Sequence, residues 1–200
     1  MAKPRLSGNC HSNQSLCPLM SRPDWQVVNL SSYQFWHCFD VAMMRLAIAE
    51  AKKGAMAGEI PVGAILAHDG QVIGKGFNQP ILSNDPTAHA EIVALRDACT
   101  YLNNYRLPPQ TTLYVTLEPC TMCFGALIHA RVGRIVFATF EPKSGVVGSQ
   151  MNLSQMGFYN HQAVVSQGLL SCECSQMLSQ FFAKRRADKR LAKQMANSTV

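Results

Sequence analysis

Four residues in two short stretches have the types and spacing of a metal site with a nearby base. The stretch DPTAHAE places His89 two residues before Glu91, and the stretch LEPCTMC places Cys120 three residues before Cys123. One imidazole and two thiolates are common ligands of Zn²⁺, and three protein ligands leave a fourth position open for water, as in a catalytic zinc site. Glu91 is then better placed to carry protons than to bind metal. The pattern predicts metal-assisted hydrolysis.

Each of these residues also has an ordinary structural interpretation. A single CxxC pair in an intracellular protein can be a redox pair or incidental, an isolated histidine is usually a packed core residue, and a glutamate is common in a first helical turn. The metal interpretation is favoured because the four residues occur together, in this order, with a helix start predicted at both places.

Both stretches are predicted to begin helices. Asp85 is a suitable N-cap and Pro86 suits the first helical position, which would place the histidine and the glutamate in the opening turn. Pro119 precedes the second helix, where the i, i+3 spacing puts both sulfurs on one face. A helix N-terminus lowers the pKa of a thiol and so favours the thiolate that binds zinc.

The elements around these stretches alternate between strands and helices. Periodicity predicts helices over about 37–55, 91–102, 120–132 and 171–190, and strands over 62–68, 71–78, 111–117, 134–140 and 163–165. Asp69 and Gly70 form a hairpin signal, because both central turn positions tolerate positive φ. The order predicts an α/β fold, a three-layer α/β/α sandwich with a central five-stranded mixed sheet. Open sheets of this kind place ligand sites at strand ends, where the two helix starts can meet.

The composition indicates one globular domain with flanking segments. Of 200 residues, 48% are hydrophobic and 15% are charged, which is typical of a folded soluble protein. We expect a flexible N-terminal extension over 1–36, one enzymatic domain over 37–193 and a disordered tail over 194–200. No apolar run predicts a membrane span or a secretory signal, so we expect a cytoplasmic protein without a membrane partner, whose eight cysteines are mainly reduced.

The positive charge is concentrated near the C-terminus. The formal net charge is +6, and residues 184–193 contain six Lys or Arg and one Asp, a net charge of +5. Such a cluster suits an anionic partner such as nucleic acid. The alternative is a solvated helix end, where cations interact favourably with the helix dipole.

Together the two motifs resemble the signature H-x-E…P-C-x-x-C of the zinc-dependent nucleoside and nucleobase deaminases. Over about residues 38–190 the chain resembles the bacterial tRNA-specific adenosine deaminases, in the segments AGEIPVGAIL, FNQPILSNDPTAHAEIVALR, LYVTLEPCTMCFGALIHARVGRIVF and SQFFAKRR. The resemblance implies a cytidine deaminase-like fold for 37–193, one Zn²⁺ per subunit and a homodimer. It also implies hydrolytic deamination of adenosine to inosine at the wobble position of a tRNA anticodon loop, by an enzyme that acts on a cyclic amidine C–N bond.

The same resemblance implies roles for individual residues. His89, Cys120 and Cys123 would be the zinc ligands. Glu91 would be the catalytic proton shuttle, which takes a proton from zinc-bound water, protonates the purine ring nitrogen as hydroxide attacks the adjacent carbon, and hands a proton to departing ammonia. Asn78 would hydrogen-bond the flipped nucleotide. The other implied substrate-binding residues are Glu59, Val62, Ala90, Glu141, Phe181, Phe182, Lys184, Arg185 and Arg186.

Two other functions remain open on the sequence. A deaminase of a free base or nucleoside, such as guanine or cytidine, would use the same zinc chemistry and would not need a cationic C-terminal helix. A non-catalytic RNA-binding module would use the zinc structurally and would not need Glu91.

Overall fold

The computed structural model describes residues 36–197 of the chain. The predicted N-terminal extension over 1–36 lies outside these residues, except for Trp36. That side chain is 7% exposed and belongs to the cluster of buried side chains beneath the first helix. The folded domain therefore includes at least one residue before the predicted boundary at 37.

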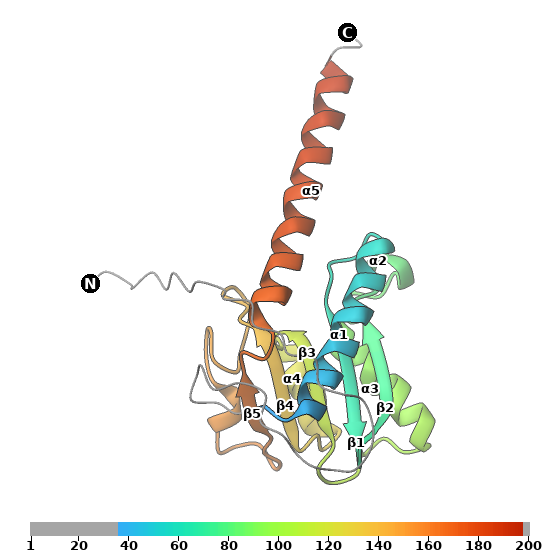
Figure 1. The fold of residues 1–200 in the computed structure, drawn as a ribbon. Coiled ribbons are helices and arrows are strands. Elements are labelled where there is room, and N and C mark those ends of the chain that lie inside the picture. Colours follow the sequence, from blue (N-terminus) through green and yellow to red (C-terminus); the bar gives the residue numbers. More distant parts are fainter. Residues whose placement is uncertain (1–35, 198–200) are drawn as a thin grey trace, which may run out of the picture.

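A mixed five-stranded sheet lies at the centre of the domain (Figure 1). The strand order is β2-β1-β3-β4-β5, in which β1 pairs antiparallel with β2 and β3, and the remaining pairs are parallel. The strands are β1 (Gly63–His68), β2 (Gln71–Phe77), β3 (Thr112–Leu117), β4 (Arg134–Thr139) and β5 (Val164–Gln167). The helices are α1 (Cys38–Met56), α2 (Pro80–Ser83), α3 (Ala90–Leu102), α4 (Thr121–His129) and α5 (Ser171–Asn197), with a 3-10 turn at Leu153–Gln155. The predicted three-layer α/β/α sandwich is confirmed.

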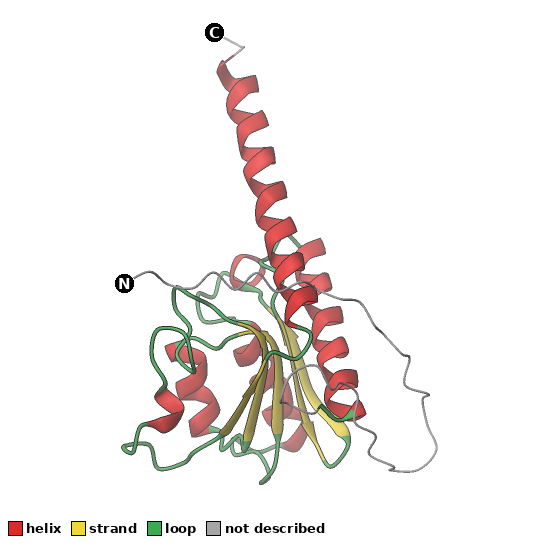
Figure 2. Ribbon diagram, turned by 60° about the vertical axis from the view of Figure 1, so that its left-hand side comes forward, coloured by secondary structure: helices red, strands yellow, loops and turns green. Residues whose placement is uncertain are grey.

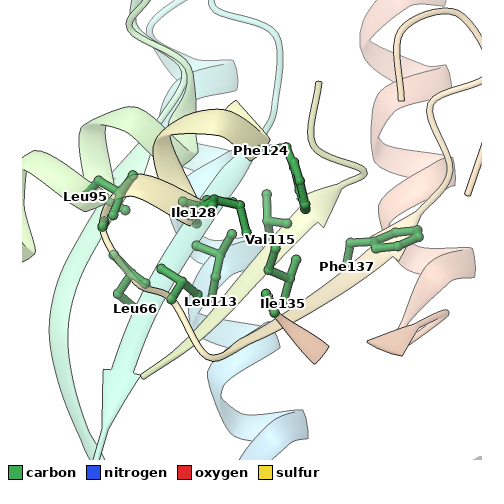
Figure 3. Close-up of a cluster of buried hydrophobic side chains, with 14 of the residues drawn as sticks. Leu66, Leu95, Leu113, Val115, Phe124, Ile128, Ile135 and Phe137 are labelled. Atoms are coloured by element: carbon green, nitrogen blue, oxygen red, sulfur yellow. The ribbon is translucent and has the colours of Figure 1, made fainter. Parts of the chain in front are cut away.

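Helices cover both faces of the sheet (Figure 2). Alternate side chains along each strand point to opposite faces. One set packs against α3 and α4, where Leu113 and Val115 of β3 meet Leu95, Phe124 and Ile128 (Figure 3). The other set packs against α1 and the start of α5. Because both faces are buried, the central strands are nearly continuous apolar runs.

The first two strands form the predicted hairpin. Asp69 and Gly70 both have positive φ, 47° and 76°, as a two-residue turn of this kind requires. Further along β2, Gly74 lies so close to α3 that a Cβ there would come within 2.7 Å of the Ala98 Cβ and 2.8 Å of its backbone nitrogen. The hairpin strand can pack closely against α3 because this position has no side chain.

A buried ionic cluster joins α1 to the sheet on the opposite face. The Asp40 carboxylate accepts hydrogen bonds from the Tyr114 hydroxyl at 2.7 Å and from the two Arg134 Nη atoms at 2.8 and 3.2 Å. Burial, followed by the Asp40 carboxylate, raises the pKa of Tyr114 above its usual range. The pairing satisfies a charge that would otherwise be costly to bury.

Helix α5 packs on the domain only over its first turns. Cys174 is buried, and Glu173 lies 3.8 Å from Arg45 and 4.0 Å from Lys52 on α1. Beyond these turns the helix projects past one end of the sheet (Figures 1 and 2). It continues to Asn197, so residues 194–197 of the predicted disordered tail are helical. Their neighbours are mainly Ala, Lys, Arg, Gln, Leu and Met, which are strong helix formers.

No helix within residues 36–197 is both long enough and apolar enough to cross a membrane.

Candidate metal and catalytic site

The sheet topology brings the two sequence motifs to the same end of the strands. Because β2 and β3 are both antiparallel to β1, they run in the same direction, and the loops that follow them leave the sheet at the same end. The loop after β2 leads to His89, and the loop after β3 leads to Cys120. The histidine and the cysteines, about thirty residues apart in sequence, therefore converge, as the strand-end prediction requires.

The local structure before His89 differs from the sequence prediction. Asp85 does not begin the helix: its Oδ1 accepts hydrogen bonds from the Thr87 backbone N–H at 2.8 Å and from the Thr87 hydroxyl at 2.7 Å. These bonds, together with that from Arg96, lower the pKa of Asp85 to about 2. Helix α3 begins at Ala90, and His89 is the extended N-cap residue, with ψ 156°. A side chain bonded two residues ahead stabilises a turn instead of a helix start.

The cysteines lie at the start of α4, as predicted, but Cys120 is the N-cap residue and Cys123 lies within the first turn. The helix ends at His129 instead of reaching 132, because Arg131 has a positive φ of 67°. At the N-cap, the Cys120 sulfur also interacts with the backbone N–H of Cys123, one of the groups that the helix itself leaves unpaired.

The three ligand atoms lie at distances that suit one tetrahedral ion. Nδ1 of His89 is 3.7 Å from the Cys120 sulfur and 3.5 Å from the Cys123 sulfur, and all three atoms lie within 4.8 Å of one another. Typical Zn–N and Zn–S bond lengths at a tetrahedral angle require an N···S separation of about 3.6 Å. The donor set and its spacing fit Zn²⁺ with a fourth position open.

The three ligand groups also shift one another's proton affinity. Hydrogen bonds from the Cys123 thiol and then from the His89 ring lower the pKa of Cys120 to about 4. The Cys120 sulfur and burial raise the pKa of Cys123, and the Cys120 sulfur raises that of His89. The site thus already stabilises one thiolate, the form in which cysteine binds zinc.

Glu91 is buried beside this group, in the first turn of α3. Its side chain is 4% exposed, and burial raises its pKa to about 7. The neighbouring Cys120 adds to this rise, whereas His89 and a hydrogen bond with Cys123 oppose it. A carboxyl group whose pKa lies near neutral pH can both accept and donate a proton, as a general acid–base requires.

Three of the predicted substrate-binding residues are joined by hydrogen bonds next to the metal group. The Asn78 backbone N–H donates to the Val62 carbonyl at 3.1 Å, and the Asn78 Oδ1 accepts from the Ala90 N–H at 2.8 Å. Asn78 therefore holds the start of α3, directly after the ligand His89. The Asn78 side-chain NH₂ is not used in either bond.

Glu59 is 2% exposed and is already engaged within the protein. Its Oε1 accepts from the backbone N–H groups of Ile81 and Leu82, both at 2.8 Å. This carboxylate therefore stabilises α2, a short helix that the sequence prediction missed. The predicted substrate-binding residue Glu59 therefore has a structural role, through the bonds of its Oε1 to α2.

The sequence prediction also missed a second structural carboxylate, that of Glu118 in the LEPC stretch. It is 3% exposed and accepts hydrogen bonds from the backbone N–H groups of Glu141, Val147 and Ser149, each at 3.0 Å, and from the Ser149 hydroxyl. The signal in the sequence was an acidic residue at the apolar end of a buried strand, where only a fully bonded carboxylate is stable.

Of the remaining predicted residues, Glu141 lies in the loop after β4, and the others lie on α5 and are exposed or partly exposed. The Phe181 and Phe182 rings meet edge to face with their centroids 5.7 Å apart, and the Arg185 guanidinium lies 5.9 Å from the Phe181 ring centroid. Lys184, Arg185 and Arg186 are all exposed. They lie on α5 beyond its packed first turns, where the helix projects from the end of the sheet at which α2 lies (Figure 1).

Comparison with known sequences identifies the family of this site. Residues 39–139 match the family described as the cytidine and deoxycytidylate deaminase zinc-binding region. The chain is also 49% identical over 161 residues to the tRNA-specific adenosine deaminase of Haemophilus influenzae, an alignment that covers 80% of this chain and 92% of that protein.

Solved structures give the same fold. A structure from a study of A-to-I editing by tRNA:A34 deaminases at the wobble position is 40% identical, with a TM-score of 0.66, and covers 68% of this chain and 98% of its own. The protein NE0047, solved in complex with 2,6-diaminopurine, is 27% identical with a TM-score of 0.63, and covers 72% of this chain and 82% of its own.

Proposed function

Because this chain belongs to the tRNA-specific adenosine deaminases, within the cytidine and deoxycytidylate deaminase zinc-binding family, we propose that it converts adenosine to inosine at the wobble position of a tRNA anticodon loop. The observation that carries the proposal is a buried glutamate beside a His–Cys–Cys metal group, at the end of the sheet from which a basic helix projects. The first two features suit hydrolytic deamination, and the third suits an RNA substrate.

His89, Cys120 and Cys123 hold the zinc ion in this proposal. Bound zinc supplies a water molecule of lowered pKa as the nucleophile. Glu91 would take one proton from the attacking water and donate it to the ring nitrogen beside the attacked carbon. It would then take the second proton of the same oxygen and pass it to the departing ammonia. Its burial supports this role, because a carboxyl group shielded from bulk water exchanges protons mainly with the substrate.

The substrate is held by residues on both sides of the metal group. The Asn78 side-chain NH₂ is the donor available to the splayed-out nucleotide, since its Oδ1 holds Ala90. In the proposal, Val62 and Ala90, which are both bonded to Asn78, lie on either side of this donor. A loop base can reach such a pocket because it can leave its stack at low cost, whereas a paired base cannot.

The phosphate backbone of the loop lies, in this proposal, along the first exposed turns of α5. Lys184, Arg185 and Arg186 supply the positive charge, and Phe181 and Phe182 supply aromatic faces on which bases can stack. Glu141 lies in the loop held by Glu118 and contacts the same RNA segment. Glu59 contributes through α2.

A deaminase of free bases is the second candidate, because NE0047 binds the purine base 2,6-diaminopurine and shares this fold. Purified protein should be given an anticodon stem-loop RNA and, separately, free adenosine, guanine and cytidine. We expect inosine in the RNA and no turnover of the free compounds. Deamination of a free compound without turnover of the RNA would contradict the proposal.

The proposal includes a homodimer in the cytoplasm, where tRNA is found. Within residues 36–197, the segment after β4 exposes several apolar side chains that a second copy would cover. Phe158 is 73% exposed, Met151 49% and Met156 42%. Light scattering of the purified protein should give twice the mass of one chain, and Phe158→Asp should shift it toward the monomer. A monomer at all working concentrations would contradict this part of the proposal.

A further inference from the structure

The buried Glu118 carboxylate organises the whole loop between β4 and the 3-10 turn. Its Oε2 accepts from the Glu141 N–H at the start of the loop and from the Ser149 hydroxyl, and its Oε1 accepts from the Val147 and Ser149 N–H groups near the loop's end. One side chain thus gathers three separate positions of residues 141–149. Without these bonds the N–H groups of Glu141, Val147 and Ser149 would lack this acceptor, and the buried carboxylate would lack donors.

The same loop packs directly on the residues that carry the metal ligand. Glu118 is followed by Pro119 and then by the ligand Cys120. The Val146 N–H donates to the Pro119 carbonyl at 3.1 Å, and Gly145 forms an isolated antiparallel bridge with Cys120. The Cβ of any other residue at 145 would collide with the Glu118 carboxylate. Loop, carboxylate and ligand therefore form one closely packed unit.

The opposite end of Glu118 is also fixed. Its backbone N–H donates to the Thr139 carbonyl at the end of β4, at 2.9 Å. Through its backbone and its side chain, Glu118 therefore links three parts of the site: the end of β4, the segment that carries the ligand Cys120, and the loop that contains Glu141. Groups that orient a metal ligand in this way control both metal affinity and ligand geometry.

We propose that Glu118 is a positioning residue that fixes loop 141–149 against Cys120, so that the metal geometry and the substrate-facing loop are set together. The effect on the metal is independent of the substrate. The effect on RNA rests on the proposed function, which assigns Glu141 of this loop to the anticodon-loop backbone.

The test is Glu118→Gln, which keeps the size of the side chain and replaces one acceptor oxygen by an NH₂ donor. In the parent protein both carboxylate oxygens accept from backbone N–H groups. Whichever way the glutamine amide is turned, its NH₂ therefore faces at least one N–H group, which loses its acceptor. We expect at least one of the amides of Glu141, Val147 and Ser149 to exchange hydrogen faster, and the affinity for zinc, measured by competition with a chelator, to fall about 10- to 100-fold. In the Co²⁺-substituted protein, the d–d bands should change in energy or intensity, because the ligand geometry changes.

The matched control is Glu50→Gln, the same chemical change at a buried glutamate that pairs with Lys53 on α1, on the other face of the sheet. It should leave zinc affinity and the Co²⁺ spectrum as in the parent protein. If Glu118→Gln does not fold, Ser149→Ala decides, because it removes only the hydroxyl donor, and a smaller fall in zinc affinity is expected.

Parent-like zinc affinity and Co²⁺ spectra in a folded Glu118→Gln, or in Ser149→Ala where Glu118→Gln does not fold, would overturn the inference. A raised KM for stem-loop RNA in Glu118→Gln would support its RNA part, and an unchanged KM would overturn that part. If the parent protein deaminates no RNA, the proposed function fails, whereas the metal measurements still decide the role of Glu118.

Discussion

Replacing Glu91 by glutamine should abolish most turnover while leaving zinc and RNA in place. Glutamine has nearly the same shape, so it fits the buried position, but its amide cannot carry a proton at neutral pH. General acid–base groups contribute about 100- to 10,000-fold to a rate. At about 1.36 kcal/mol for each factor of ten, this is about 3 to 5 kcal/mol of transition-state stabilisation.

The structure places this loss in the upper half of that range, at about 1,000-fold or more. Glu91 is 4% exposed, so bulk water does not readily replace it. The ionisable groups whose interactions with Glu91 shift its pKa are His89, Cys120 and Cys123, and all three would be engaged as ligands once zinc is bound. Within residues 36–197 we therefore see no second group that could take over the proton transfer.

The assay measures inosine formed in an anticodon stem-loop RNA, with zinc content and RNA affinity determined on the same preparation. Glu91→Gln should keep one zinc per chain and bind RNA with the parent affinity. Glu50→Gln on α1 serves as the control for the chemical change. Turnover of Glu91→Gln within about threefold of the parent rate would refute the role of Glu91 as the proton carrier, since that role requires a loss of at least about 100-fold.

Three further predictions test the metal, the basic helix and the packing. His89→Ala should leave zinc content well below one per chain with no turnover, and full activity in this variant would refute the metal hypothesis. Replacing Lys184, Arg185 and Arg186 together by Gln should reduce the slope of log affinity for RNA against log salt by about 2 to 3, because each lost phosphate contact removes about 0.7 to 0.9. An unchanged slope would show that these side chains do not contact phosphates. Gly74→Ala should lower stability by about 1 to 3 kcal/mol, because the new Cβ meets Ala98 on α3, whereas Gly125→Ala, where nothing lies within 4 Å of the new Cβ, should not destabilise the domain. Equal melting temperatures of the parent and Gly74→Ala would contradict the close packing of β2 on α3.

The elements with strong local signals were predicted correctly from the sequence. Asp69-Gly70 specified the hairpin because its turn type depends on two residues, and the apolar periodicity specified α1 and α3 to within two residues at each end. The ligand set was predictable for the same reason. His89 and the CxxC pair carry their chemistry in residue type and spacing, and the alternation of strands and helices already placed both at strand ends.

The N-cap signal at Asp85 placed the start of α3 too early, because two local alternatives competed. Asp85 followed by Pro86 is a good helix start, but the Asp85 carboxylate bonds to Thr87 and Arg96 instead. The turn is favoured where the chain must bring His89 to the cysteines, and that requirement comes from the whole fold. The longer α5 was missed for a different reason, since its last turns are exposed and bury no apolar face that a pattern could reveal; they form by intrinsic propensity.

The sequence by itself determined the chemistry of this protein: a His–Cys–Cys metal group with a glutamate, in a chain that alternates strands and helices, with a basic C-terminal helix. Only the tertiary structure decided which polar residues support that chemistry from within. Glu118 bonds to residues 23 to 31 positions away, and Glu59 to residues 22 and 23 positions away. Neither pairing follows a local period, because a buried carboxylate takes its partners from whichever backbone N–H groups the folded chain brings to it.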